Sequence, residues 1–136
     1  MNDLKEVVRP FYTQCLTVNN EVNVAELMGK LLADNFESRS SVEVKGKAQL
    51  IGQIQFFWKL IPDLRWEIQE ILQDGNNVIV RSMASGKPNG DFMGLPTNGS
   101  KPFKIMTIDI HTIENGRIVK VYHLEDWPTA MKQLKG

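Results

Sequence analysis

Residues 103–127 predict two long strands joined by a tight turn, and this hairpin limits the possible folds more than any other segment. The turn falls at Asn115-Gly116, the dipeptide that best accepts the positive φ angles of a type I′ hairpin. A two-residue turn fixes which residues oppose each other across the strands, whereas a three-residue loop with a bulge would shift the register by one and could separate His111 from Asp126. The expected pairs are Asp109 with Tyr122, His111 with Lys120, and Ile105 with Asp126.

Side chains alternate between the two faces of a strand, so this pairing divides the hairpin into two unlike surfaces. One face would carry the polar and titratable residues Thr107, Asp109, His111, Lys120, Tyr122 and Asp126. The other would be mainly apolar, with Met106, Ile108, Ile110, Val119, Val121 and His123. The sequence therefore predicts that the titratable groups of this region gather on one side of the ribbon.

Three helices are predicted before the main strands, because apolar residues recur there at spacings of three and four. They cover residues 4–16, 24–36 and 50–61, and Pro62 ends the third. Pro10 would kink the first helix or delay its start. Asn23 is placed to cap the second helix. The weak alternation over 38–44 favours a short strand between the second and third helices.

The later part of the chain has the two-residue period of strands. Residues 65–73 and 78–84 predict a second hairpin, and 86–99, with four glycines and two prolines, predict a long structured loop. Pro128 would start a short C-terminal turn through Leu134. Helices first and strands later indicate an α+β fold, a single domain over 1–136 with three N-terminal helices on a curved, mostly antiparallel sheet.

Composition narrows the classes of partner. Sixteen basic and sixteen acidic residues leave no net charge, so long-range attraction to nucleic acid or an anionic membrane is not expected. The single cysteine, Cys15, excludes an intramolecular disulfide and indicates a core residue. Neither a secretion signal nor a membrane span is indicated, so a cytoplasmic location is expected. His111 and His123 would lie on opposite faces, so no metal site is expected.

Several segments together resemble the SnoaL-like polyketide cyclase and ester cyclase branch of the NTF2-like (cystatin-like) superfamily. They are IPDLR at 61–65, DG at 74–75, GDFMGLP at 90–96 followed by NG at 98–99, NGRIV at 115–119, and the closing Asp126. Each motif alone is weak. The series, in this order over most of the chain, is specific for the fold and less so for the branch.

The resemblance implies a cone-shaped α+β barrel with a largely apolar cavity, commonly a homodimer formed through the sheet. Characterised polyketide cyclases of this family close a ring by an intramolecular aldol reaction, without metal or cofactor. They use an aspartate near the C-terminus as acid/base, with a histidine on the preceding strand nearby. Those positions match Asp126 and His111.

Each candidate also has a purely structural interpretation. Asp126 could cap a C-terminal helix, and His111 could be a hydrogen-bonded core histidine. Asp109 could pair across the strands with the Tyr122 hydroxyl or with Lys120. The aromatic residues Tyr12, Trp58 and Tyr122 are most simply core residues, although in a hollow fold they would also line a substrate pocket together with Asp109.

Together with these residues, the resemblance implies a small-molecule-binding protein that acts on an apolar, polyketide-like carbonyl compound as a cofactor-independent cyclase or isomerase. Asp126 would be the acid/base and His111 its polar assistant, because an apolar cavity moves the pKa of a carboxyl group towards the working pH. The alternative is a non-catalytic ligand-binding or dimeric interaction module on the same fold. A dehydratase is a third option, but the dehydratases that this chain resembles use a second pocket histidine, and His123 is expected to face away. The homodimer expectation depends on the apolar outer face of the hairpin.

Overall fold

The three predicted N-terminal helices all form, between Lys5 and Leu60, in this computed structural model, which describes residues 3–136. The first helix has two parts, because a π-helical turn, η1, follows α1 directly. Asn23 caps the second helix as predicted, since its side chain accepts a hydrogen bond from the backbone N–H of Glu26 at 3.1 Å. The bounds are α1 Lys5–Pro10, η1 Phe11–Cys15, α2 Val24–Leu31 and α3 Lys47–Leu60.

Helix α2 ends five residues before the predicted end, and the chain turns directly into a strand. This strand, β1 (Leu32–Arg39), pairs antiparallel with the short β2 (Val44–Gly46). Lys47 explains the early end of α2, because its Nζ donates to the carbonyl oxygens of Gly29 at 2.8 Å and Leu32 at 2.9 Å. A lysine thus satisfies carbonyl groups that the end of the helix leaves free.

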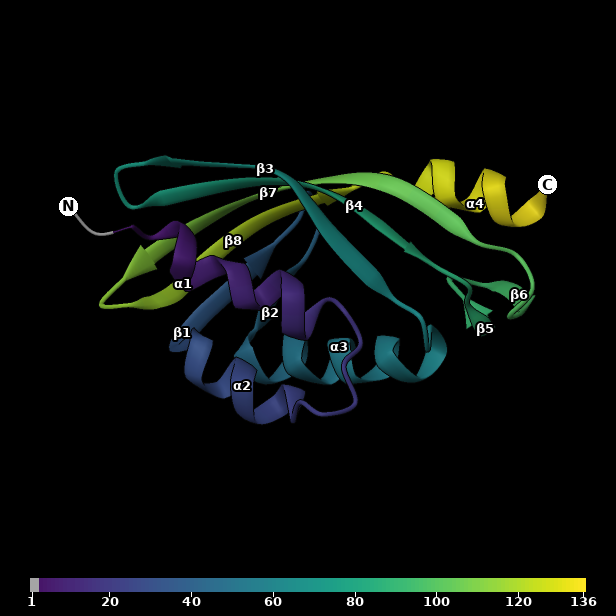
Figure 1. The fold of residues 1–136 in the computed structure, drawn as a ribbon, viewed down its shortest axis with the longest axis horizontal. Coiled ribbons are helices and arrows are strands. Elements are labelled where there is room, and N and C mark those ends of the chain that lie inside the picture. Colours follow the sequence, from purple (N-terminus) through teal and green to yellow (C-terminus); the bar gives the residue numbers. More distant parts are fainter. Residues whose placement is uncertain (1–2) are drawn as a thin grey trace.

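Six strands form one curved sheet in the order β2-β1-β8-β7-β4-β3, antiparallel except where β1 pairs with β8. Figure 1 shows α1, α2 and α3 on the same side of this sheet, so the α+β arrangement predicted from the sequence is confirmed. A fourth helix, α4 (Trp127–Lys135), follows the last strand. The remaining bounds are β3 Arg65–Asp74, β4 Asn77–Gly86, β7 Phe103–Glu114 and β8 Arg117–Glu125.

The predicted long loop contains a small hairpin of its own. Strands β5 (Asn89–Phe92) and β6 (Leu95–Asn98) pair with each other and lie at the same end of the molecule as α4 (Figure 1). Phe92 stacks on Phe103 with ring centroids 5.6 Å apart and meets the edge of Trp127 at 5.7 Å. This aromatic cluster attaches the hairpin to the main sheet and to α4.

The register expected for the main hairpin is wrong by one residue. The turn has two residues as predicted, with φ of 51° at Asn115 and 75° at Gly116. A β-bulge at Val119 then inserts one extra residue into β8, because Ile113 pairs with Ile118 but Thr112 pairs with Lys120. Every residue of β8 after the bulge therefore changes face relative to the prediction.

The bulge changes which side chains face the helices. Asp109 pairs with His123 instead of Tyr122, and His111 pairs with Val121 instead of Lys120. The inner face of β8 now carries Val121, His123 and Glu125. The outer face of the sheet carries exposed apolar side chains, namely Met106, Ile108, Ile110, Tyr122 and Leu124.

None of the helices in the described part of the chain is long and apolar enough to cross a membrane.

Candidate active site

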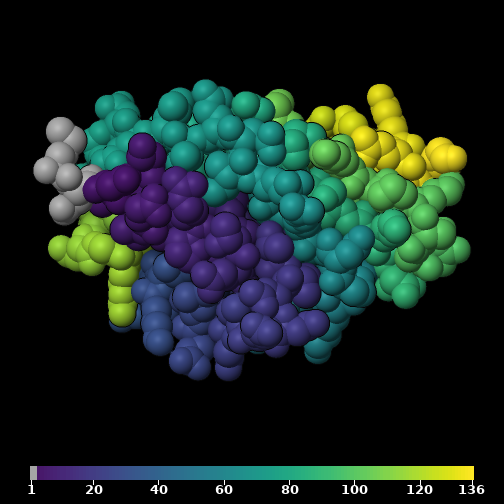
Figure 2. Space-filling model, viewed as in Figure 1, coloured from purple at the N-terminus to yellow at the C-terminus, as the bar shows by residue number. Residues whose placement is uncertain are grey.

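A cavity of about 370 Å³ lies between the inner face of the sheet and helix α3. This volume is within the range of roughly 300–1,000 Å³ that small-molecule pockets occupy. The N-terminal segment, purple in Figure 2, runs across the face of the molecule shown there, and its residues Phe11 and Leu16 form part of the cavity wall. The other apolar residues with side chains on the inner side of the sheet that line the cavity are Leu50, Ile54, Phe57, Trp66, Met93, Val121 and Trp127.

Asp109 lines this cavity from the centre of β7 and is only 4% exposed. Its Oδ2 accepts a hydrogen bond of 2.6 Å from the Tyr12 hydroxyl. Its Oδ1 is buried and has no hydrogen-bond partner among residues 3–136. The pKa of Asp109 is raised to about 7, mainly because burial disfavours the charged form. The Tyr12 hydrogen bond and the His123 charge lower this pKa, whereas the Glu125 charge adds to the increase.

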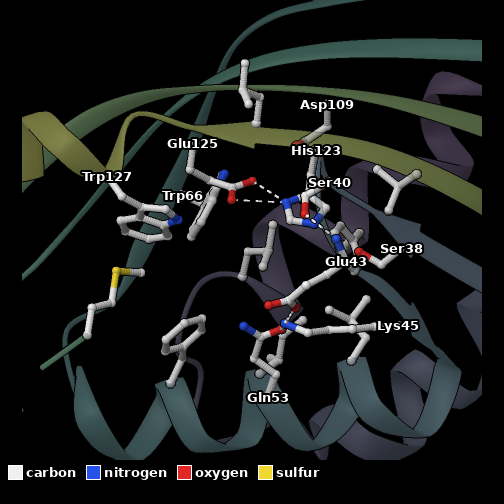
Figure 3. A pocket seen from close by; sticks show the side chains of 18 residues that line it. Ser38, Ser40, Glu43, Lys45, Gln53, Trp66, Asp109, His123, Glu125 and Trp127 are labelled. Atoms are coloured by element: carbon white, nitrogen blue, oxygen red, sulfur yellow. Dashed lines mark hydrogen bonds and ion pairs between the residues drawn. The ribbon is translucent and has the colours of Figure 1, made fainter. Parts of the chain in front are cut away.

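His123 and Glu125 form an ion pair on the cavity wall beside Asp109 (Figure 3). The Nδ1 of His123 lies 2.8 Å and 3.0 Å from the two carboxylate oxygens of Glu125. The Glu125 hydrogen bond raises the pKa of His123, while partial burial lowers it. Because Nδ1 faces Glu125, Nε2 is the ring nitrogen left for a ligand.

The two ends of the cavity differ in polarity. Trp66 and Trp127 lie at one end in Figure 3, where flat apolar groups can pack against them. The other end is polar, and there Lys45 Nζ lies 3.1 Å from a Glu43 carboxylate oxygen and donates to Gln53 Oε1 at 2.8 Å. Ser38 and Ser40 complete this polar end.

The structure does not bring Asp126 and His111 together. Asp126 is exposed and lies outside the cavity lining, because it caps α4, where its oxygens accept hydrogen bonds from the Thr129 backbone N–H at 3.3 Å and hydroxyl at 2.7 Å. His111 is completely buried behind the cavity wall, and its Nε2 lies 2.6 Å from the Tyr12 hydroxyl. The expectation that these two residues share one face is wrong, since it depended on the unbulged register.

The remaining pocket predictions have mixed outcomes. Asp109 lines the cavity. Tyr12 does not line it but lies behind Asp109, to which its hydroxyl donates a hydrogen bond. Trp58 does not line the cavity, because its Nε1 donates to the Cys15 carbonyl oxygen at 2.8 Å. Tyr122 is 48% exposed on the outer face of the sheet.

Sequence reasoning missed Glu125 altogether and placed His123 on the wrong face. The same bulge explains both errors, because it turns both residues inward. Lys45 and Gln53 were also missed. They occur singly on a weakly patterned strand and on a helix, so no local signal identified them. Within residues 3–136, no three His, Cys, Asp or Glu side chains are grouped so that they could hold a metal ion.

Solved structures with the same fold include two candidate polyketide cyclases and a candidate hydroxylase. A candidate SnoaL-like polyketide cyclase from Jannaschia sp. CCS1 superimposes with a TM-score of 0.86 at 18% identity, over 98% of this chain and 92% of that one. IdmH from Streptomyces antibioticus, a candidate polyketide cyclase, gives 0.83 at 22% identity, over 99% and 100%. AclR from Streptomyces galilaeus, a candidate hydroxylase, gives 0.76 at 17% identity, over 96% and 91%.

These similarities establish the fold, since all three structures are less than 25% identical to this chain. Among curated proteins, none matches the sequence significantly. The sequence profile described as SnoaL-like polyketide cyclase matches residues 6–134, which is nearly the whole chain. The chain therefore belongs to the SnoaL-like polyketide cyclase family.

Proposed function

We propose that the protein is a cofactor-independent acid/base catalyst that removes a proton next to a carbonyl group of a flat, largely apolar compound, as in polyketide cyclisation. One observation carries this proposal. A buried carboxyl group, Asp109, lines a cavity with one oxygen unpartnered, next to the His123–Glu125 pair. A buried polar atom without a partner is rare in proteins, and at such a position it marks a place for ligand contact.

Asp109 is the proposed base. With a pKa near 7, the side chain has both ionised and protonated forms at neutral pH. The ionised form accepts a proton from the substrate carbon, and the protonated form returns it later in the reaction. The free Oδ1 is the oxygen that would exchange this proton, because Oδ2 is held by Tyr12.

His123 is the proposed stabiliser of the enolate. Removal of the proton leaves negative charge on the carbonyl oxygen, and a protonated histidine can donate a hydrogen bond to that oxygen through Nε2. Glu125 holds the ring by Nδ1 and favours the protonated form. Donors of this kind typically contribute a few kcal/mol to transition-state stabilisation, on the order of 3 kcal/mol each.

Ring closure completes an aldol reaction without a further reagent. The enolate carbon forms a bond with a second carbonyl carbon of the same molecule, and the resulting alkoxide takes the proton from Asp109. A second possibility is dehydration, in which His123 protonates a departing hydroxyl group after the same first step; His123 would act there without a second cavity histidine, because His111 lies behind the wall. Both reactions begin with proton removal from carbon.

Proton exchange at carbon therefore tests the proposal without knowledge of the product. Aromatic 1,3-diketones are incubated with the protein in D₂O, and loss of the α-proton signal is followed by NMR. We expect the protein to accelerate exchange in compounds that bind the cavity, with binding detected by quenching of Trp66 and Trp127 fluorescence. A compound that binds without faster exchange would instead identify a ligand-binding module.

We also propose that the exposed apolar face of β7 and β8 packs against a second copy of the chain. Ile108 and Ile110 are 41% and 39% exposed on this face, and the absence of net charge means that two copies do not repel each other strongly. Sedimentation velocity at micromolar concentration should show a dimer. The double substitution of Ile108 and Ile110 by lysine should give a monomer, and a wild-type monomer would contradict the proposal.

A further inference from the structure

We propose that His111 acts through Tyr12 to orient Asp109 and to stabilise its ionised form, so that Tyr12 and His111 are positioning residues for the cavity base. Neither is assigned a direct contact with substrate. The inference rests on the proposed role of Asp109, but its test needs no turnover.

The geometry fixes the direction of the two hydrogen bonds that link His111, Tyr12 and Asp109 when Asp109 is ionised. The Tyr12 hydroxyl lies 2.6 Å from Asp109 Oδ2 and 2.6 Å from His111 Nε2. The hydroxyl has a single proton, and an ionised carboxylate can only accept, so this proton goes to Asp109. The contact with His111 must then be donated by Nε2–H to the Tyr12 oxygen. When the Tyr12 oxygen accepts a hydrogen bond from His111, the Tyr12 hydroxyl becomes a stronger donor to Asp109.

The N-terminal segment is shaped to place Tyr12 at this point. Pro10 has no N–H to continue the α-helical pattern, and the chain widens directly after it into the π-helical turn η1. The wider turn is closed by the bond from Leu16 N to Phe11 O at 2.9 Å. The Tyr12 carbonyl oxygen accepts from the Thr17 hydroxyl at 2.8 Å. The backbone of Tyr12 is therefore held on both sides.

The protonation state of His111 is also well defined. Complete burial lowers its pKa to about 3, so the ring stays neutral at every pH at which the protein would work. Phe11 and Tyr12 both meet the ring edge-on, with centroids 5.7 Å away. Its Nδ1 is buried without a partner in the described part of the chain. A neutral ring in this position has one N–H, and ionised Asp109 requires it at Nε2.

The other charged groups around Asp109 do not replace the hydrogen bond from Tyr12 that stabilises its ionised form. From β8, Glu125 opposes ionisation of Asp109 and His123 favours it. Glu43 and Lys45, at the polar end of the cavity, pair with each other. Tyr12 is thus the group that binds Asp109 directly, and His111 is the group behind it.

The wild-type protein provides the first test. Histidine ¹⁵N NMR at pH 9 should show His111 as the neutral tautomer protonated at Nε2, and the ring should remain neutral down to pH 5. A ring protonated at Nδ1 at pH 9, or a His111 that becomes an imidazolium near pH 6.5, would overturn the inference.

Variants provide the second test, through the ¹³C NMR titration of the Asp109 carboxyl group. Loss of the hydroxyl in Tyr12→Phe should raise the titration midpoint by roughly one pH unit or more, and His111→Leu should raise it by a smaller amount. His111→Gln, whose amide keeps an N–H donor, should restore much of the wild-type midpoint. Tyr122→Phe removes an exposed hydroxyl and is the matched control, with no expected shift. An unchanged midpoint in a folded His111→Leu protein would refute the role of His111.

The two proposals fail in different ways. If the carboxyl titration shifts as expected but the pH dependence of proton exchange does not follow it, the hydrogen-bond chain is supported and Asp109 is not the base. If exchange depends on Asp109 but its titration is indifferent to Tyr12 and His111, the proposed function stands and the positioning role is refuted.

Discussion

Substitution of Asp109 by asparagine is expected to slow α-proton exchange of a bound 1,3-diketone by roughly 10²–10⁴-fold, the range that a positioned general base contributes. Asparagine keeps the size of the side chain and can still accept the Tyr12 hydrogen bond, but it cannot take a proton. Ligand binding, followed by tryptophan fluorescence, should change by less than about tenfold, because the apolar cavity walls remain. A rate within about twofold of wild type would exclude Asp109 as the base.

Asp126→Asn is the matched control, because it makes the same chemical change at the residue that family resemblance selects. Asparagine caps helices about as well as aspartate, so α4 should keep its first turn and the protein its stability. The structure places Asp126 outside the cavity lining, and we expect nearly wild-type exchange. The opposite result, with exchange lost in Asp126→Asn and kept in Asp109→Asn, would support the assignment made from the sequence.

The sequence was sufficient for the overall fold because most elements have their own signal, although β1 lies largely where a continuation of the second helix was predicted. Helical spacing of apolar residues, a cap at Asn23, and Asn115-Gly116 at the turn all agree with the global arrangement. Such agreement between local preference and overall architecture is typical of natural proteins. The order of the elements, with helices first and strands later, then predicted the helices on one side of a curved sheet, which Figure 1 shows.

The site could not be predicted in the same way because it depends on a single inserted residue. Ile118, Val119 and Val121 are all apolar, so alternation alone does not show which of them leaves the pleat. Without a glycine or proline at the bulge, no local signal marks it. The unbulged register placed Tyr122 under the helices and His123 on the outer face, whereas in the structure Tyr122 is exposed and His123 is half-buried on the cavity wall. Tertiary packing, including parallel pairing of β1 with β8, is the information that the sequence pattern lacks.

A carboxyl group kept in an apolar cavity should cost stability whenever it is ionised. The folded protein holds the proton of Asp109 up to about pH 7, whereas an unfolded chain releases it near the ordinary value of 3.8. The free energy of unfolding therefore falls as pH rises through this window. With about 1.4 kcal/mol for each pH unit, the loss is on the order of 4 kcal/mol above pH 7.

The effect of His111 on the free energy of unfolding has the opposite dependence on pH. Burial lowers its pKa from 6.5 to about 3, so the unfolded chain binds a proton that the folded protein does not. Its contribution to the free energy of unfolding is complete above pH 6.5 and is lost as pH falls towards 3. Between about pH 4 and 6.5 the two effects oppose each other, so the wild-type protein should show only a weak pH dependence from this pair.

Asp109→Asn should separate the two effects. Relative to wild type, its free energy of unfolding is expected to increase by roughly 4 kcal/mol from pH 4 to pH 8, because only the wild-type protein has to ionise a buried carboxyl group. His123 and its Glu125 partner are present in both proteins, so most of their contribution cancels from the difference. Urea unfolding of both proteins at pH 4, 6 and 8 measures this difference in the free energy of unfolding. Asp126→Asn is the control, and its free energy of unfolding should change with pH as that of wild type does. A difference that does not change with pH would mean that Asp109 titrates as an ordinary aspartate. The proposed base would then lack the raised pKa that suits it to accept and return a proton at neutral pH.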